Sequence, residues 1–323
     1  APAFNCKFLP VKSTHDASAF IDDGFPGIVY AADHGANIIN CSWGSSQFSL
    51  MEQDVVNYAT FNKDALIVAA AGNGYVEETH FPSSYSNVIS VAATTQTDGK
   101  APFSSFGGTI DVCAPGANIY ATIFDNSYTG LDGTSMASPI AAGCAAMIKS
   151  RFPALNALQV GEQLRTTCDN IYGVSGNSTY IGKLGKGRVN LFKAVTDSIS
   201  PGVIVKKNDI TDGNNNVFVI GDTLSIVSLF ENLLRPTTNL TCSLSTTNPY
   251  VQVLQPNFTA GVMGTLDTLS NFAAKYRVYI RPTAPLNTAV TLRITLTDGT
   301  WSDNFLVDII VNVDYINIAI NNV

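Results

Sequence analysis

Charged residues are scarce in this sequence, and the few that are present do not cluster. Only 13% of the 323 residues are Asp, Glu, Lys or Arg, and the formal net charge is -7. Without a Lys/Arg patch, a nucleic acid is not expected as a partner. No apolar run is long enough to span a bilayer. The opening residues 1–13 lack the basic start and continuous apolar core of a signal peptide.

Cysteine and histidine are also few. Six cysteines in a chain of this length are too sparse for a disulfide scaffold. Cys41, Cys113 and Cys144 lie inside apolar segments and are predicted to be buried free thiols. No Cys/His spacing indicates a zinc site. The three histidines, His15, His34 and His80, leave few candidates for a catalytic base.

What the sequence does have is apolar residues, which make up 46% of it, enough for a large core and two domains. Up to residue 199, short apolar runs alternate with helical patterns. Such alternation predicts an α/β fold with a parallel sheet covered by helices on both faces. The predicted strands cover 6–12, 36–43, 65–72, 88–94 and 109–116. The predicted helices cover 17–35, with an interruption at Pro26, then 49–62, the apolar stretch 136–148, 155–168 and 189–198.

The pattern changes at the Pro-Gly junction in residues 199–205. After it no helical period is found, and alternating or β-branched runs are separated by turn residues. This indicates an antiparallel β-sandwich of about seven strands, similar to immunoglobulin or fibronectin domains. The predicted domains are therefore 1–199 and 200–323. The sandwich carries no motif with a chemical interpretation.

The stretch DGTSMASPIAAGCAAMIKSRFP, residues 132–153, places Ser135 before an almost unbroken apolar run. A helix that is apolar all round must be buried. We expect Pro139 in its first turn, where a missing N–H costs little. Ser135 would then lie at the helix N-terminus, where free backbone N–H groups can hold an oxyanion. The alternative is that Ser135 is only a helix cap.

Five blocks of residues, in order, resemble the subtilisin-like serine proteases. They are INCSWG at 39–44, VAAAGN at 68–73, FSSFGGTIDVCAPG at 103–116, GTSMASP at 133–139 and GKGRVN at 185–190. The resemblance covers residues 1 to about 199. The α/β-hydrolases, another class with a serine nucleophile, require Gly-x-Ser-x-Gly, and Ala137 stands where that motif needs its last glycine.

The resemblance implies roles for individual residues. Ser135 would be the nucleophile and Asn73 the side-chain donor to the oxyanion. The backbone of Ser42, Trp43 and Gly44 would pair with an extended substrate. The Trp43 side chain would either form a wall of the substrate cleft or pack against the 17–35 helix. The substrate side chain next to the cleaved bond would enter a pocket formed by Ala70, Ala71, Gly72 and Ser83. His80 would lie at the floor of this pocket.

The resemblance also implies two features of the 80–90 segment, HFPSSYSNVIS. The Phe81–Pro82 peptide bond is predicted to be cis. Backbone carbonyls of Ser83, Tyr85 and Val88 are candidate ligands of a structural calcium ion, although no carboxylate cluster supports it. No cofactor is expected to be required.

The acid and base of the triad have no counterpart in these residues. In this family the order is Asp, then His, then Ser. None of the three histidines has the family's sequence context, and Ala1–Pro2 resembles the point just after the histidine helix. We therefore expect the Asp and the His on an N-terminal segment or separate chain. The fold would be incomplete at its N-terminus, and residues 1–323 alone would be close to inert.

The sequence thus predicts a secreted or cell-surface serine endopeptidase acting on peptides or proteins. A catalytically silent peptide-binding or scaffold protein with an incomplete triad is the alternative. In a third hypothesis the sandwich is the functional part, as an adhesin or carbohydrate binder.

Overall fold

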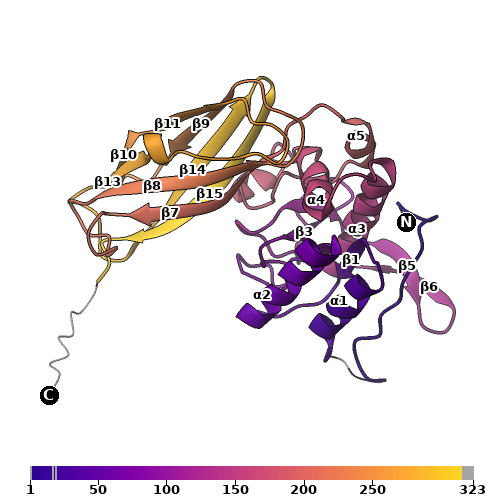
Figure 1. Ribbon diagram of the computed structural model, residues 1–323. Coiled ribbons are helices and arrows are strands. Elements are labelled where there is room, and N and C mark those ends of the chain that lie inside the picture. Colours follow the sequence, from indigo (N-terminus) through magenta and orange to yellow (C-terminus); the bar gives the residue numbers. More distant parts are fainter. Residues whose placement is uncertain (1, 17, 19, 315–323) are drawn as a thin grey trace, which may run out of the picture. The chain divides into compact units, whose positions relative to one another are not determined.

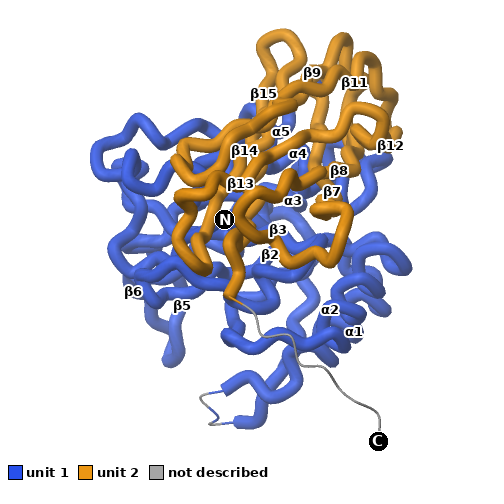
Figure 2. The backbone as a smooth tube through the Cα atoms, turned by 90° about the vertical axis from the view of Figure 1, so that its left-hand side faces the viewer, with its two compact units in different colours: residues 1–198 blue, residues 199–323 orange. Residues whose placement is uncertain are grey.

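The computed structural model describes residues 2–16, 18 and 20–314. The chain divides into two compact units, Ala1–Ser198 and Ile199–Val323 (Figure 2). The sequence placed the domain boundary one residue later, after residue 199. Among the described residues, no helix has the length and apolar character needed to cross a membrane.

The first unit is built on a four-stranded parallel sheet of order β1-β2-β3-β4. Every residue of β2 and β3 is buried, as expected for central strands of a sheet covered on both sides. The parallel register places Asn40 beside Val68, and Val68 beside Ile89. The strands are β1 (Ile38–Cys41), β2 (Leu66–Ala70), β3 (Val88–Thr94) and β4 (Val112–Pro115).

Helices cover the two faces of this sheet with two different cores (Figure 1). Side chains alternate between the faces along a strand, so Val68 joins the core under α3 and α4, while Ala69 joins the core under α1 and α2. This confirms the predicted α/β class. The helices are α1 (Gly24–Asp33), α2 (Leu50–Asn57) with a π-helical turn (Tyr58–Asn62), α3 (Thr134–Arg151), α4 (Ala157–Thr166) and α5 (Leu191–Thr196).

Two local predictions near the start of the chain were wrong. The predicted strand at 6–12 has no strand partner and runs as irregular chain. The helix predicted at 17–35 begins only at Gly24, so Pro26 is its third residue and lies in the first turn. There its missing N–H costs no intrahelical bond, and it does not interrupt the helix.

A hairpin between the sheet and α3 was not predicted. It pairs β5 (Ile119–Ile123) with β6 (Ser127–Leu131), and the rings of Tyr120 and Tyr128 stack across it with centres 5.8 Å apart. Short 3-10 turns occur at Asn177–Tyr180 and Phe272–Ala274.

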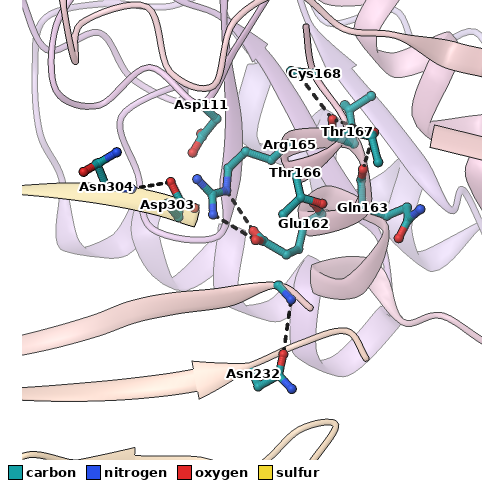
Figure 3. A network of polar contacts seen from close by, with 12 residues as sticks. Asp111, Glu162, Gln163, Arg165, Thr166, Thr167, Cys168, Asn232, Asp303 and Asn304 are labelled. Atoms are coloured by element: carbon teal, nitrogen blue, oxygen red, sulfur yellow. Dashed lines mark hydrogen bonds and ion pairs between the residues drawn. The ribbon is translucent and has the colours of Figure 1, made fainter. Parts of the chain in front are cut away.

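Helix α4 shows how the sequence fixes a helix locally. The Asn156 side chain accepts a hydrogen bond from the Gln159 N–H, and Gln159 reciprocates, which makes a capping box. Further along, Arg165 donates from Nε and Nη2 to the Glu162 carboxylate at 2.8 Å each (Figure 3).

The described part of the second unit is a β-sandwich with nine strands, against the roughly seven predicted. Its two sheets run β10-β13-β8-β12, with β7 also on β8, and β11-β9-β14-β15. One core takes residues from both sheets, such as Phe230 of β8 and Leu292 of β14. The strands are β7 (Val203–Thr211), β8 (Thr223–Asn232), β9 (Leu240–Ser245), β10 (Val251–Gln255), β11 (Asn257–Gly261), β12 (Thr268–Ser270), β13 (Tyr276–Ile280), β14 (Thr288–Asp298) and β15 (Trp301–Val311).

Candidate active site

Ser135 is the second residue of α3. Gly133 precedes the helix with a φ of 155°, a backbone conformation that side-chain-bearing residues rarely adopt. Pro139 is the sixth residue of α3 and not in its first turn, contrary to the prediction. Because proline has no N–H, the Ser135 carbonyl lacks its usual partner four residues on.

A reciprocal pair of hydrogen bonds joins this helix start to the end of β1. The Ser42 hydroxyl donates to the Ser135 carbonyl at 2.9 Å and so takes the place left by Pro139. In return, the Ser135 hydroxyl donates to the Ser42 carbonyl at 3.3 Å. The Ser138 hydroxyl adds a third link, because it donates to Asn40 Oδ1 at 2.7 Å. The nucleophile candidate is therefore fixed to the carboxyl end of a parallel strand.

Asn73 follows β2 and lies beside the same helix start. Its Oδ1 accepts hydrogen bonds from the Thr134 N–H at 2.9 Å and from the Thr134 hydroxyl at 3.0 Å. With the amide oxygen held by two donors, the amide nitrogen is oriented the other way. It lies 3.8 Å from where a Cβ on Gly133 would be. A side-chain N–H donor thus stands next to Gly133 and the Ser135 backbone.

Two of the glycines predicted to line the substrate cleft lie close to the His80 imidazole. A Cβ on Gly44 would lie 2.6 Å from His80 Nε2, and one on Gly72 would lie 3.3 Å from His80 Cγ. Ser83 is buried, and its hydroxyl donates to the His80 carbonyl at 2.5 Å. Ala70 and Ala71 are buried at the end of β2. Burial lowers the pKa of His80, although the nearby Glu78 carboxylate opposes this.

Trp43 packs against α1, which was one of its two predicted roles. Its ring meets the Phe25 ring edge-on with centres 5.3 Å apart, and a Cβ on Gly24 would collide with it. Two residues after Trp43, Ser45 and Phe81 exchange backbone hydrogen bonds of 2.8 and 2.7 Å. The Phe81–Pro82 bond is cis, as predicted.

No histidine in the described part of the chain is hydrogen-bonded to Ser135. His34 ends α1, where its ring stacks on Tyr30 and its Nδ1 lies 2.8 Å from the Tyr30 carbonyl. His15 lies in the irregular chain before α1.

The described residues contain no group of three or more His, Cys, Asp or Glu side chains that could hold a metal ion. The calcium site predicted on the carbonyls of Ser83, Tyr85 and Val88 would use backbone oxygens instead, and it stays a prediction. The Tyr85 hydroxyl donates to Glu52 at 2.6 Å, and burial raises the pKa of Tyr85 to about 12.

Sequence reasoning missed two features near the site. Glu78 accepts a hydrogen bond from the Ser105 hydroxyl at 2.5 Å, and nothing in its sequence context distinguished it from other loop carboxylates. A separate hollow of about 410 Å³ contains Lys100, whose ammonium lies 4.7 Å from the centre of the Tyr75 ring and 5.2 Å from that of Tyr180.

Comparison with known proteins gives this geometry a context. A family model described as "Subtilase family" matches residues 2–192. The thermophilic serine proteinase of Bacillus sp. (strain AK1) is 41% identical over 59% of this chain and 46% of its own length. Thermitase of Thermoactinomyces vulgaris is 44% identical over 52% of this chain and 57% of its own. The chain spans about half the length of these curated relatives.

Among solved structures, a protease of Pseudoalteromonas arctica PAMC 21717 superposes with a TM-score of 0.54 and 28% sequence identity. The match covers 60% of this chain and 63% of that one.

Proposed function

Because this chain belongs to the subtilase family of serine proteases, we propose that it is the nucleophile-bearing part of a serine endopeptidase. One observation carries the proposal. The Ser135 hydroxyl and the Asn73 amide both lie at the start of α3, where Thr134 precedes Ser135 and is hydrogen-bonded to Asn73. An attacking oxygen and a donor for the developing negative charge are what acyl transfer from a peptide requires.

In the proposed reaction, a base takes the Ser135 proton as Oγ bonds to the peptide carbonyl carbon. The carbonyl oxygen becomes an oxyanion, which the Asn73 amide and the Ser135 backbone N–H stabilise. The C–N bond then breaks, and the leaving amine takes the proton from the base. Water hydrolyses the resulting ester, with the base acting again, and regenerates the serine hydroxyl.

We propose that the base is a histidine, oriented by an aspartate, from polypeptide outside residues 1–323. Two observations support this. The Ser135 hydroxyl donates to the Ser42 carbonyl, and no histidine in the described part of the chain is hydrogen-bonded to Ser135. In the described sheet, β1 pairs only with β2, so its other edge can accept a further strand.

Denaturing intact-mass analysis of the purified natural protein tests the origin of the base. We expect a longer chain, or a second polypeptide, that carries an Asp and a His in the family's sequence context. Detection of the 323-residue species alone would favour the alternative function, a catalytically silent peptide-binding or scaffold protein.

Labelling with a fluorophosphonate tests the nucleophile in the complete protein. We expect one phosphonylated residue, Ser135, and loss of both label and peptide cleavage in Ser135→Ala. Ser175→Ala is the matched control, because Ser175 is an exposed loop serine and should change neither. Cleavage that persists in a folded Ser135→Ala variant would contradict the proposal.

Other parts of the proposal need tests of their own. Secretion or cell-surface placement is tested by fractionating the source cells. A structural calcium ion at Ser83, Tyr85 and Val88 should make the melting temperature fall when a chelator removes the ion.

We propose that residues 200–323 form a separate sandwich domain that supports the protease. Glycan-binding and protein-binding assays would test the alternative hypothesis that this domain is an adhesin or carbohydrate binder.

A further inference from the structure

The asparagine of the candidate active site is followed directly by a glycine. Asn73-Gly74 is the only Asn-Gly pair in the 323-residue sequence. Glycine has no Cβ to keep its nitrogen away from the preceding side chain, and its backbone turns freely. Asparagine is also one of the thermolabile residue types. The residue proposed to hold the oxyanion therefore stands in a sequence context that favours loss of its amide.

The reaction open to such a pair needs only water and base. The Gly74 backbone nitrogen gives its proton to the base and bonds to Cγ of Asn73, which places negative charge on Oδ1. The bond from Cγ to Nδ2 then breaks, and the nitrogen takes a proton from solvent and leaves as ammonia. Water opens the succinimide ring at either carbonyl, which leaves aspartate or isoaspartate at position 73.

Two donors at the start of α3 favour this attack. The Thr134 N–H and hydroxyl donate to Asn73 Oδ1 at 2.9 and 3.0 Å. Donors at such distances stabilise the charge that develops on the oxygen of an attacked carbonyl. The same bonds turn Nδ2 away from Thr134, and Asn73 is exposed, so ammonia can leave into solvent.

A buried hydroxyl opposes the attack. The Gly74 N–H donates to Ser105 Oγ at 3.0 Å, and Ser105 is buried. The Ser105 hydroxyl donates in turn to Glu78 Oε1 at 2.5 Å, which orients a lone pair of Oγ toward Gly74. While this bond holds, the glycine nitrogen is directed at Ser105, and its proton is not available to a base.

The backbone on both sides of the pair is fixed by the same segment. The Ser105 N–H donates to the Gly72 carbonyl at 3.1 Å. The Tyr75 N–H donates to the Phe103 carbonyl, also at 3.1 Å. The peptide plane that follows Asn73 is thus restrained from rotating by itself to bring its nitrogen to Cγ. The reaction requires the bond to the Ser105 hydroxyl to open first.

We infer that Asn73 is a deamidation site whose reaction inactivates the catalytic centre, and that Ser105 delays it. An aspartate at position 73 keeps one oxygen on Thr134 but replaces the amide donor with a second oxygen, which repels an oxyanion. An isoaspartate lengthens the main chain at the same point. The modification itself does not depend on the proposed function, whereas the loss of activity rests on it.

Peptide mapping of the complete protein tests the inference, with Ser135→Ala introduced to prevent self-digestion. Mass spectrometry quantifies deamidation, and enzymatic methylation quantifies isoaspartate, during incubation at pH 6 and at pH 9. We expect both products at position 73 and faster formation at pH 9, because the attacking nitrogen must lose a proton. Asn126, which precedes Ser127 at the exposed tip of the β5–β6 hairpin, is the internal reference.

Adding Ser105→Ala should raise the rate at Asn73 by about 5-fold or more, the factor that one hydrogen bond contributes, and leave the rate at Asn126 unchanged. Glu78→Gln is the matched control, because its amide oxygen can still accept from the Ser105 hydroxyl. Gly74→Ala is the second variant in case Ser105→Ala unfolds the loop, and thermal melting checks each. The atoms nearest to its Cβ belong to side chains. Because this Cβ hinders the attack, the rate at Asn73 should fall below that at Asn126.

Several results would overturn the inference: intact Asn73 in the parent and in Ser105→Ala after Asn126 has deamidated, equal rates at pH 6 and pH 9, or a rate that neither folded variant changes. The effect on activity is measured with Ser135 retained. The more acidic, deamidated form, separated by ion exchange, should show a kcat lower by about 10²-fold or more. Equal kcat in the two forms would contradict the inactivation.

Failure of the proposed function would be seen separately, as absence of fluorophosphonate labelling and cleavage by the freshly purified protein. The deamidation rates do not depend on that result.

Discussion

At the scale of single residues, Asn73 and Thr134 act together. Both donors of Thr134 hold the amide oxygen of Asn73, so the amide nitrogen faces the Ser135 side. If the amide stabilises an oxyanion, Asn73→Ala should lower kcat by about 10²–10³-fold with little change in KM.

Thr134→Val provides a graded control for this prediction, because it removes the hydroxyl donor and keeps the N–H donor. We expect a loss in kcat of about 10-fold, corresponding to one hydrogen bond of about 1 kcal/mol or slightly more. Peptide hydrolysis by the complete protein measures both variants, and an Asn73→Ala variant with unchanged kcat would contradict the role.

At the scale of elements, the position of Pro139 explains why Ser42 contacts α3. With no N–H at residue 139, the Ser135 carbonyl depends on the Ser42 hydroxyl. Ser42→Ala should therefore lower the free energy of unfolding by about 1–3 kcal/mol, because a part-buried carbonyl loses its partner.

The same substitution should cost less than about 1 kcal/mol in a Pro139→Ala background, where the new N–H can bond to the Ser135 carbonyl. Urea unfolding of the unmodified protein, the two single variants and the double variant measures this coupling. Additive effects in the double variant would show that the two donors do not share the carbonyl.

The Asp169 carboxylate links helix α5 and the residues just before it to the segment that follows α4. The Asp169 carboxylate accepts a hydrogen bond from Lys193 Nζ at 2.6 Å, and it also accepts hydrogen bonds from Arg188 and Asn190. These hydrogen bonds, of which the one from Lys193 has the largest effect, lower the pKa of Asp169 to about 2. A carboxyl whose folded pKa is depressed stabilises the fold above its unfolded pKa of 3.8, and the contribution disappears as pH falls toward 2.

We therefore expect Asp169→Asn to lower stability at pH 6 by about 1–2 kcal/mol, allowing for solvent screening, and to leave a smaller difference at pH 2. Asp125→Asn, at the exposed tip of the β5–β6 hairpin, is the control. Chemical unfolding across pH 2 to 6 measures the difference. An equal loss at both ends would contradict the assignment.

The elements that were predicted correctly are those whose signal is local. Buried strands such as β2 and β3 are nearly continuous apolar runs, and α3 is long and mostly apolar before its basic last turn. The chain at 6–12 also holds several apolar residues, but a strand needs a neighbour, and the sheet as described ends at β1. The β5–β6 hairpin has mixed polarity and was missed because its strands are not buried.

The candidate site was located through sequence motifs and not through physical pattern. Helix geometry alone left Ser135 as a cap or a nucleophile, and only the surrounding blocks separated the two. Ser42 takes the place of the N–H that Pro139 lacks, although the two residues are 97 positions apart in the sequence. Glu78 lies on a loop and meets Ser105, which is distant in sequence. Such contacts depend on tertiary structure that periodicity does not encode.

At the scale of the whole molecule, each unit has its own core. Leu292 lies at the centre of the sandwich core and is fully buried, as are Ile226 and Phe230. Calorimetry of the complete protein should resolve a separate sandwich transition. Leu292→Ala should destabilise that transition by about 2–5 kcal/mol and leave the melting of the α/β unit unchanged. A single transition that shifts as a whole would contradict independent folding.

The cross-links at the start of α3 have a consequence for how the site tolerates motion. Ser42 and Asn73 follow neighbouring strands, and they are hydrogen-bonded to two adjacent residues of α3, Ser42 to Ser135 and Asn73 to Thr134. A small displacement of the helix carries the serine hydroxyl and draws the asparagine amide along with it. We therefore expect the distance between the Ser135 Oγ and the Asn73 amide nitrogen to fluctuate less than the position of either atom, so that the two groups keep their spacing while the scaffold moves.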